Sequence, residues 1–145
     1  MSFWDKYGII AKAIRSAFVI DNGSFDTAFE LRPSLLQARI GKALSDGIRG
    51  QGKRGTEMLH DVEGKIATRG AGDPEAMYKI AEAYAMLGDR PSAVRALRAS
   101  IEGGFFSYPY FVTDPLLEGL RSDNDFQRQL TAARQRHEAF KKRFF

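Results

Sequence analysis

The chain has 145 residues, of which 43% are apolar and 28% are charged, a composition typical of one globular domain with a single core. It contains no cysteine, which excludes disulfides, thiolate metal ligands and a cysteine nucleophile. No apolar stretch is long enough for a transmembrane helix, and charged residues interrupt the first twenty positions, so we expect neither a membrane span nor a signal peptide. These features favour a cytoplasmic protein.

The net charge of +4 is concentrated in one part of the sequence. Residues 126–145 sum to +5, whereas residues 1–125 sum to −1. A body this close to neutral makes nucleic acid an unlikely ligand. The basic run itself could contact nucleic acid, anionic lipid or an acidic partner, and we favour a solvated outer face of a helix.

The first third of the chain predicts several helices. Apolar residues recur every three or four positions over residues 3–19, which indicates an amphipathic helix, and a second helix is expected from its N-cap Ser24 to about Leu31. Residues 1–32 therefore form an N-terminal helical section. Residues 33–70 read as an irregular repeat, with a helix over 34–48, a glycine-rich loop over 47–55 and a further helix stopped at 70–72.

Residues 73–104 carry the clearest pattern. Met77-x-x-Ile80-Ala81-x-x-Tyr84 is followed by Ala93-x-x-x-Leu97. Start signals at Asp73-Pro74 and glycines at 88 and 103 predict two successive helices, and the small residues at 81 and 93 predict their close approach.

Residues 105–145 form the last section. Pro109 is expected to keep the aromatic segment over 104–111 from being helical, and Asp114-Pro115 to start a short helix that ends at Leu120. A closing helix is expected to cover the open end of the array with an apolar stripe. That stripe consists of Phe126, Leu130, Ala133, His137, Phe140 and Phe144.

The pattern over residues 73–104 resembles the tetratricopeptide repeat (TPR), whose signature is W-x-x-L-G-x-x-Y followed by A-x-x-x-F. Ile40-Gly41-x-x-Leu44 repeats part of it earlier in the chain. Residues 73–143 are also similar to the C-terminal end of TPR arrays in bacterial signalling proteins, which include winged-helix regulators, adenylate cyclases and serine/threonine kinases. The segment over 102–121, the helix start Asp125-Phe126 and the run over 133–140 carry this likeness.

This resemblance implies a single all-α domain, a right-handed α-solenoid of helix–turn–helix repeats with N-terminal helices and a C-terminal capping helix. It further implies a non-catalytic protein–protein interaction module or scaffold in bacterial signalling or assembly, whose concave groove binds a peptide or a partner helix. The groove residues would be Glu75, Tyr78, Lys79, Glu82 and Met86 of the clear repeat and Arg39, Lys42 and Asp46 of the irregular one.

Tyr78 and Met86 are the expected apolar anchors of this groove. The groove lacks the lysine and asparagine set with which chaperone-binding arrays hold a peptide carboxylate, so a chaperone tail is not the expected partner. The alternative function is a regulatory oligomerisation domain, in which the terminal helices form a homodimer.

Two features that could indicate other chemistry do not support it. Residues 47–53 match G-x-x-x-x-G-K, but Arg54 stands where a phosphate-binding loop needs a hydroxyl, and a helical pattern precedes the loop instead of a strand. The histidines, His60 and His137, lie on different predicted helices without ligand spacing, and the carboxylates after His60 are expected to point around the helix. We therefore expect no catalytic residue, cofactor or metal.

Overall fold

The computed structural model of the chain describes residues 22–68 and 73–145. Within these ranges all secondary structure is helical, which confirms the all-α prediction there. The elements are α3 (Asn22–Leu31), α4 (Leu36–Ile48), α5 (Gly52–Thr68), α6 (Pro74–Leu87), α7 (Arg90–Glu102), α8 (Tyr108–Thr113), the 3₁₀ helix η1 (Pro115–Leu120) and α9 (Asn124–Phe144). The helix predicted over residues 3–19 and the stop at 70–72 lie outside the described residues. None of the described helices is both long and apolar enough to cross a membrane.

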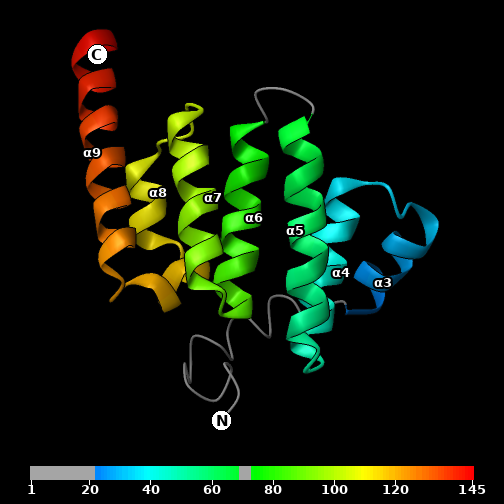
Figure 1. Ribbon diagram of the computed structural model, residues 1–145. Coiled ribbons are helices and arrows are strands. Elements are labelled where there is room, and N and C mark those ends of the chain that lie inside the picture. The colour runs from blue at the N-terminus through cyan, green and yellow to red at the C-terminus, as the bar shows by residue number, and fades with distance from the viewer. Residues whose placement is uncertain (1–21, 69–72) are drawn as a thin grey trace.

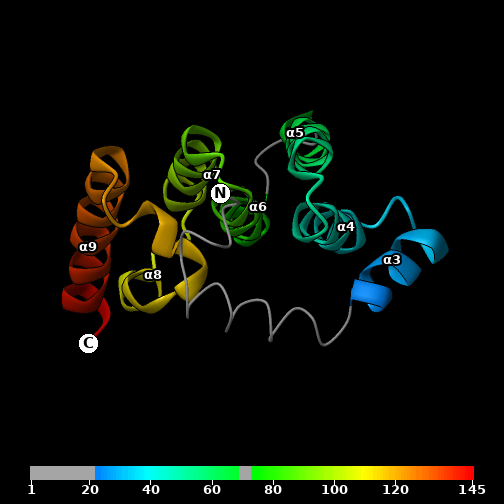
Figure 2. The same ribbon diagram turned by 90° about the horizontal axis from the view of Figure 1, so that it is seen from below.

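The helices form two layers. α4 packs against α5 and α6 packs against α7, each pair joined by a short connection, and the two hairpins stand side by side (Figure 1). Seen along the helices, α4 and α6 lie in one layer and α5 and α7 in the other, with α3 beside α4 and α9 across the opposite end of the bundle (Figure 2). The two hairpins meet where α6 contacts both α4 and α5.

Local capping sets the limits of the second hairpin. The side chain of Asp73 accepts a hydrogen bond from the Glu75 amide at the start of α6, and Asp89 does the same for Ser92 at the start of α7. Gly88 ends α6 with a φ of 83°, a backbone conformation that favours glycine. Both helices therefore begin and end close to where the sequence predicts.

Small residues bring the paired helices together. Ala81 and Ala93, on facing helices of the second hairpin, are both fully buried. In the first hairpin, a Cβ atom at Gly55 would lie only 2.5 Å from the Ala43 carbonyl oxygen, so that glycine allows α4 and α5 to touch. The glycine-rich loop expected over 47–55 is thus wrong, since only residues 49–51 connect the two helices.

The aromatic segment also differs from the prediction. Pro109 lies in the first turn of α8, where its missing N–H breaks no helical hydrogen bond, so residues 108–111 are helical, whereas residues 104–107 are not. Asp114 then caps η1 by accepting a hydrogen bond from the Leu116 amide. Arg121 donates to the carbonyl oxygens of Phe111 and Asp114, which holds α8 and η1 together.

The buried apolar side chains form one cluster that extends from α4 to α9. Phe126, Leu130 and Ala133 are buried, so the first half of the predicted stripe on α9 covers the bundle as expected. The second half does not, since Phe140 and Phe144 are 45% and 59% exposed.

Candidate functional site

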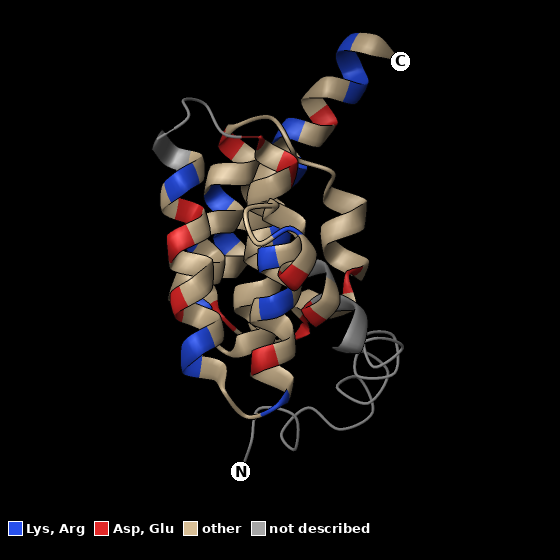
Figure 3. Ribbon diagram, turned by 90° about the vertical axis from the view of Figure 1, so that its right-hand side faces the viewer, with Lys and Arg blue, Asp and Glu red and all other residues tan. Residues whose placement is uncertain are grey.

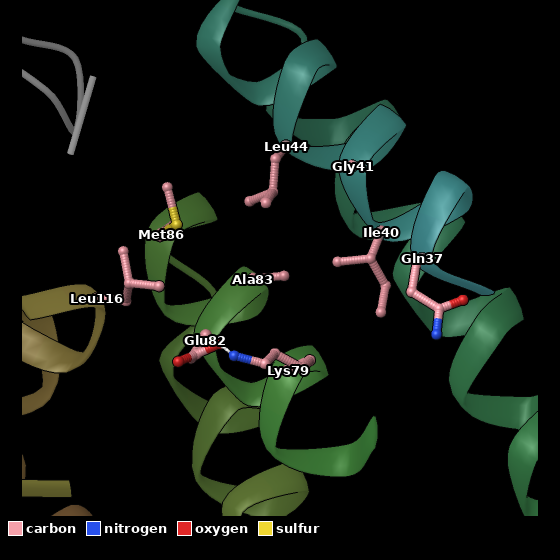
Figure 4. A pocket seen from close by; sticks show the side chains of 9 residues that line it. All are labelled: Gln37, Ile40, Gly41, Leu44, Lys79, Glu82, Ala83, Met86 and Leu116. Carbon is pink, nitrogen blue, oxygen red and sulfur yellow. Dashed lines mark ion pairs between the residues drawn. The ribbon is translucent and has the colours of Figure 1, made fainter. Parts of the chain in front are cut away.

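An apolar pocket of about 260 Å³ lies between α4 and α6, next to η1 (Figure 4). The small residues Gly41 and Ala83 face this space from the two helices and leave it open. The lining residues are Gln37, Ile40, Gly41 and Leu44 of α4, Lys79, Glu82, Ala83 and Met86 of α6, and Leu116 of η1. The pocket therefore joins both hairpins and the segment that follows them.

The size and the walls of the pocket limit what it can hold. Small-molecule and cofactor sites usually measure about 300–1,000 Å³, so this pocket is small for such a ligand. Its volume matches that of one large apolar side chain or of two aliphatic side chains. Lys79, half exposed at the rim, offers a charged hydrogen-bond donor beside the apolar walls.

Three predicted groove residues of α6 meet at this pocket, namely Lys79, Glu82 and Met86. Met86 is almost fully buried and contributes to the wall rather than projecting from it. Glu75 is exposed one turn earlier, at a second hollow of about 220 Å³ that it shares with Phe105 and Tyr110. The exposed face of α6 thus carries two neighbouring hollows with Lys79 between them.

The expectation that Tyr78 is an exposed anchor is wrong. Tyr78 is fully buried, its ring stacks on Phe111 with a centroid distance of 5.0 Å, and its hydroxyl donates a hydrogen bond to Asp114. The reason is that the segment over residues 105–120 folds back onto this part of α6. Part of the face that the repeat pattern assigns to a partner is occupied by the chain itself.

The three residues predicted on α4 do not reach the pocket. Lys42 binds Asp46 at 2.8 Å and Asp26 of α3 at 3.3 Å, while Arg39 pairs with Asp61 of α5. These ion pairs turn the side chains toward α3 and α5, which corrects the predicted groove on this helix. The α4 residues that do line the pocket are Gln37, Ile40, Gly41 and Leu44. Three of them, Ile40, Gly41 and Leu44, belong to the partial repeat pattern of the sequence, which did not assign them to the groove.

A buried carboxyl pair lies beside the pocket. Glu82 is 4% exposed, and burial together with hydrogen bonding to Asp114 raises the pKa of Glu82 to about 8, although Lys79 at 3.3 Å opposes the change. Burial and the neighbouring Asp114 thus favour the protonated form of Glu82, and the cation of Lys79 favours the ionised form. Burial and the same aspartate also raise the pKa of Tyr78, so its hydroxyl stays neutral. The cluster links α6 to the junction of α8 and η1.

A second polar cluster joins α5, α6 and α7. The Tyr84 hydroxyl donates to Glu63 at 2.7 Å and lies 3.0 Å from Nδ1 of His60, and Arg95 donates to both Glu63 oxygens. Burial would raise the pKa of Glu63, but the hydrogen bonds from Arg95 and Tyr84 hold it below its ordinary value. The prediction that the carboxylates after His60 do not converge with it is therefore wrong for Glu63, because residues three apart share a helix face.

Neither cluster resembles a metal centre. Among the described residues, no three histidine, aspartate or glutamate side chains are placed so that they could hold a metal ion together. Both clusters connect helices, whereas the pocket between α4 and α6 is open to solvent.

No family model, no curated protein and no solved structure matches this chain. The likeness to TPR proteins accordingly stays a prediction from the sequence pattern.

Proposed function

We propose that this chain is a TPR-type α-solenoid module that binds another protein and catalyses no reaction. In this proposal, a peptide or a helix of the partner inserts an apolar side chain between α4 and α6. Three features support such an array. They are two successive helical hairpins, small residues where the helices of a hairpin cross, and a layer that α4 and α6 share.

The observation that carries the proposal is the pocket at the junction of the two hairpins. Its walls are apolar, with Ile40 and Leu44 on one side and Met86 on the other (Figure 4). Lys79 lies 3.3 Å from Glu82, and its side chain is half exposed at the rim of the pocket. The ammonium group can then pair with a carboxylate of the partner, so we expect a motif with an apolar residue beside an acidic one.

The polar clusters of the described residues support a role in binding rather than catalysis. Glu63 accepts hydrogen bonds from Tyr84 and Arg95, and Asp114 accepts one from Tyr78, so each cluster connects helices. The resemblance to signalling proteins supports a setting in bacterial signalling or assembly in the cytoplasm.

Selection from a library of displayed random peptides would test the proposal. We expect enriched peptides to share an apolar residue next to an acidic one, and we would measure the affinity of one such peptide by fluorescence polarisation. Ala83→Leu fills part of the pocket and should weaken binding at least tenfold, roughly the 1.4 kcal/mol that this factor represents. Lys79→Glu should also weaken it, through loss of the charge pair.

Ala99→Leu is the matched control, since Ala99 is exposed on α7 and lies away from the pocket. It should leave the affinity unchanged. Peptides that bind wild type and Ala83→Leu equally well would place the contact elsewhere, and a library that yields no peptide would count against a peptide-binding groove.

A further inference from the structure

The second half of α9 extends beyond the other helices and carries exposed aromatic side chains. Figures 1 and 3 both show this part of the helix projecting from the bundle. Phe140, Phe144 and Phe145 are 45%, 59% and 98% exposed, and the ring of Phe140 lies 4.7 Å from that of Phe144 and 6.5 Å from that of Phe145. The three rings therefore form one apolar cluster in contact with water.

Cations surround this cluster. Lys141, Lys142 and Arg143 stand between the phenylalanines and are all exposed, and the guanidinium of Arg143 lies 5.5 Å from the centre of the Phe144 ring. Residues 134–145 sum to +4, with Glu138 as their one acidic residue. Basic residues in a last helical turn interact favourably with the helix dipole, which accounts for the cations but not for the exposed rings.

We propose that the α9 tip, defined as residues 140–145, docks reversibly on the surface of an anionic lipid bilayer. The phenylalanine rings enter the boundary between headgroups and acyl chains, where their apolar area leaves water. The neighbouring cations lie on several sides of the helix, so their long side chains can reach lipid phosphates around the inserted rings. Because the tip projects from the bundle, it can touch a flat surface before the rest of the protein does.

A second copy of the chain is a less suitable partner for the α9 tip than a lipid bilayer. The exposed parts of the three rings add up to about two whole phenylalanine side chains, or roughly 400 Å². A stable interface usually needs about 800 Å² from each partner. A symmetric contact would also bring the same cations of both copies together, since the same patch is used twice.

Single-stranded nucleic acid fits less well too. Bases stack on open aromatic faces along a basic groove, whereas Arg143 lies over the Phe144 ring and residues 1–125 sum to −1.

Vesicle flotation of the full chain at about 0.1 M salt, where the Debye length is about 10 Å, tests the proposal. Wild type should bind vesicles made of equal parts phosphatidylcholine and phosphatidylglycerol, and should not bind phosphatidylcholine alone. The triple variant Lys141→Glu/Lys142→Glu/Arg143→Glu removes three cations from the anionic surface and adds three anions, so it should lower the partition coefficient at least 100-fold. Phe140→Ser/Phe144→Ser should lower it at least tenfold, as estimated from lost apolar burial.

A matched control reverses three exposed cations on other helices, Lys53→Glu, Arg54→Glu and Arg98→Glu. It changes the net charge by the same amount and should alter partition by less than about threefold, because charges beyond a Debye length from the surface are screened. Thermal unfolding of each variant verifies its folding. In a Trp4→Phe background, Phe144→Trp should shift its emission to the blue on vesicle binding.

Several results would overturn the inference. These are equal binding to both kinds of vesicle, no binding to either, equal losses in the tip and control variants, or an unchanged emission of the tryptophan at position 144. If the protein sediments as a dimer and Phe140→Ser/Phe144→Ser converts it to a monomer, the α9 tip binds a second copy of the chain. Displacement of the protein from vesicles by a single-stranded oligonucleotide would assign it to nucleic acid.

Discussion

Substitution of Glu82 by glutamine is expected to stabilise the protein against unfolding at alkaline pH. Glu82 lies buried between Lys79 and Asp114, where burial and the aspartate raise the pKa of Glu82 from 4.5 to about 8. The folded chain therefore binds a proton that the unfolded chain releases between these two values. The stabilisation from this proton is fully present below about pH 4.5 and is lost as the pH rises through about 8.

The size of the effect follows from the same values. One pKa unit is worth about 1.4 kcal/mol, so a rise from 4.5 to about 8 corresponds to at most about 5 kcal/mol. Glutamine has nearly the shape of glutamic acid, cannot ionise and can still donate a hydrogen bond to Asp114. The free energy of unfolding of Glu82→Gln, relative to wild type, should therefore increase by several kcal/mol between about pH 5 and about pH 9.

Urea unfolding followed by circular dichroism across this pH range would measure the difference. Glu75→Gln is the matched control, since Glu75 is an exposed carboxylate on the same helix, and it should show no such trend. If wild type and Glu82→Gln lose stability in parallel as the pH rises, Glu82 is not protonated in the folded chain.

Two further predictions concern the contacts between helices. Gly55→Ala should destabilise the fold by about 2 kcal/mol or more, because its Cβ would meet the Ala43 carbonyl, whereas Gly64→Ala, with open space around its Cβ, should stabilise it by about 0.5–1 kcal/mol. Equal effects of the two substitutions in urea unfolding would contradict the close approach of α4 and α5. Tyr84→Phe should cost about 1–3 kcal/mol by removing the hydroxyl that donates to Glu63, and an unchanged unfolding midpoint would show that this hydrogen bond contributes nothing.

The sequence alone determined the features that depend on residues close to one another along the chain. The helical class and the limits of α6 and α7 follow from periodicity and from local signals such as Asp73, Pro74 and Gly88, which act within one turn. The inward positions of Ala81 and Ala93 follow in the same way from their spacing. These features can be predicted without knowing which segments pack against the helices.

Only the tertiary structure decided which helix faces remain open. Tyr78 has the spacing of a groove residue, yet it is buried because the segment over 105–120 folds back on α6, and nothing near Tyr78 in the sequence encodes that return. Likewise, Arg39 and Lys42 are drawn to carboxylates on α5 and α3. The stripe on α9 is regular along its length, but where the bundle ends decides that Phe140 is exposed. Exposure depends on contacts between residues far apart in the chain, and a periodic pattern reports only which residues share a face.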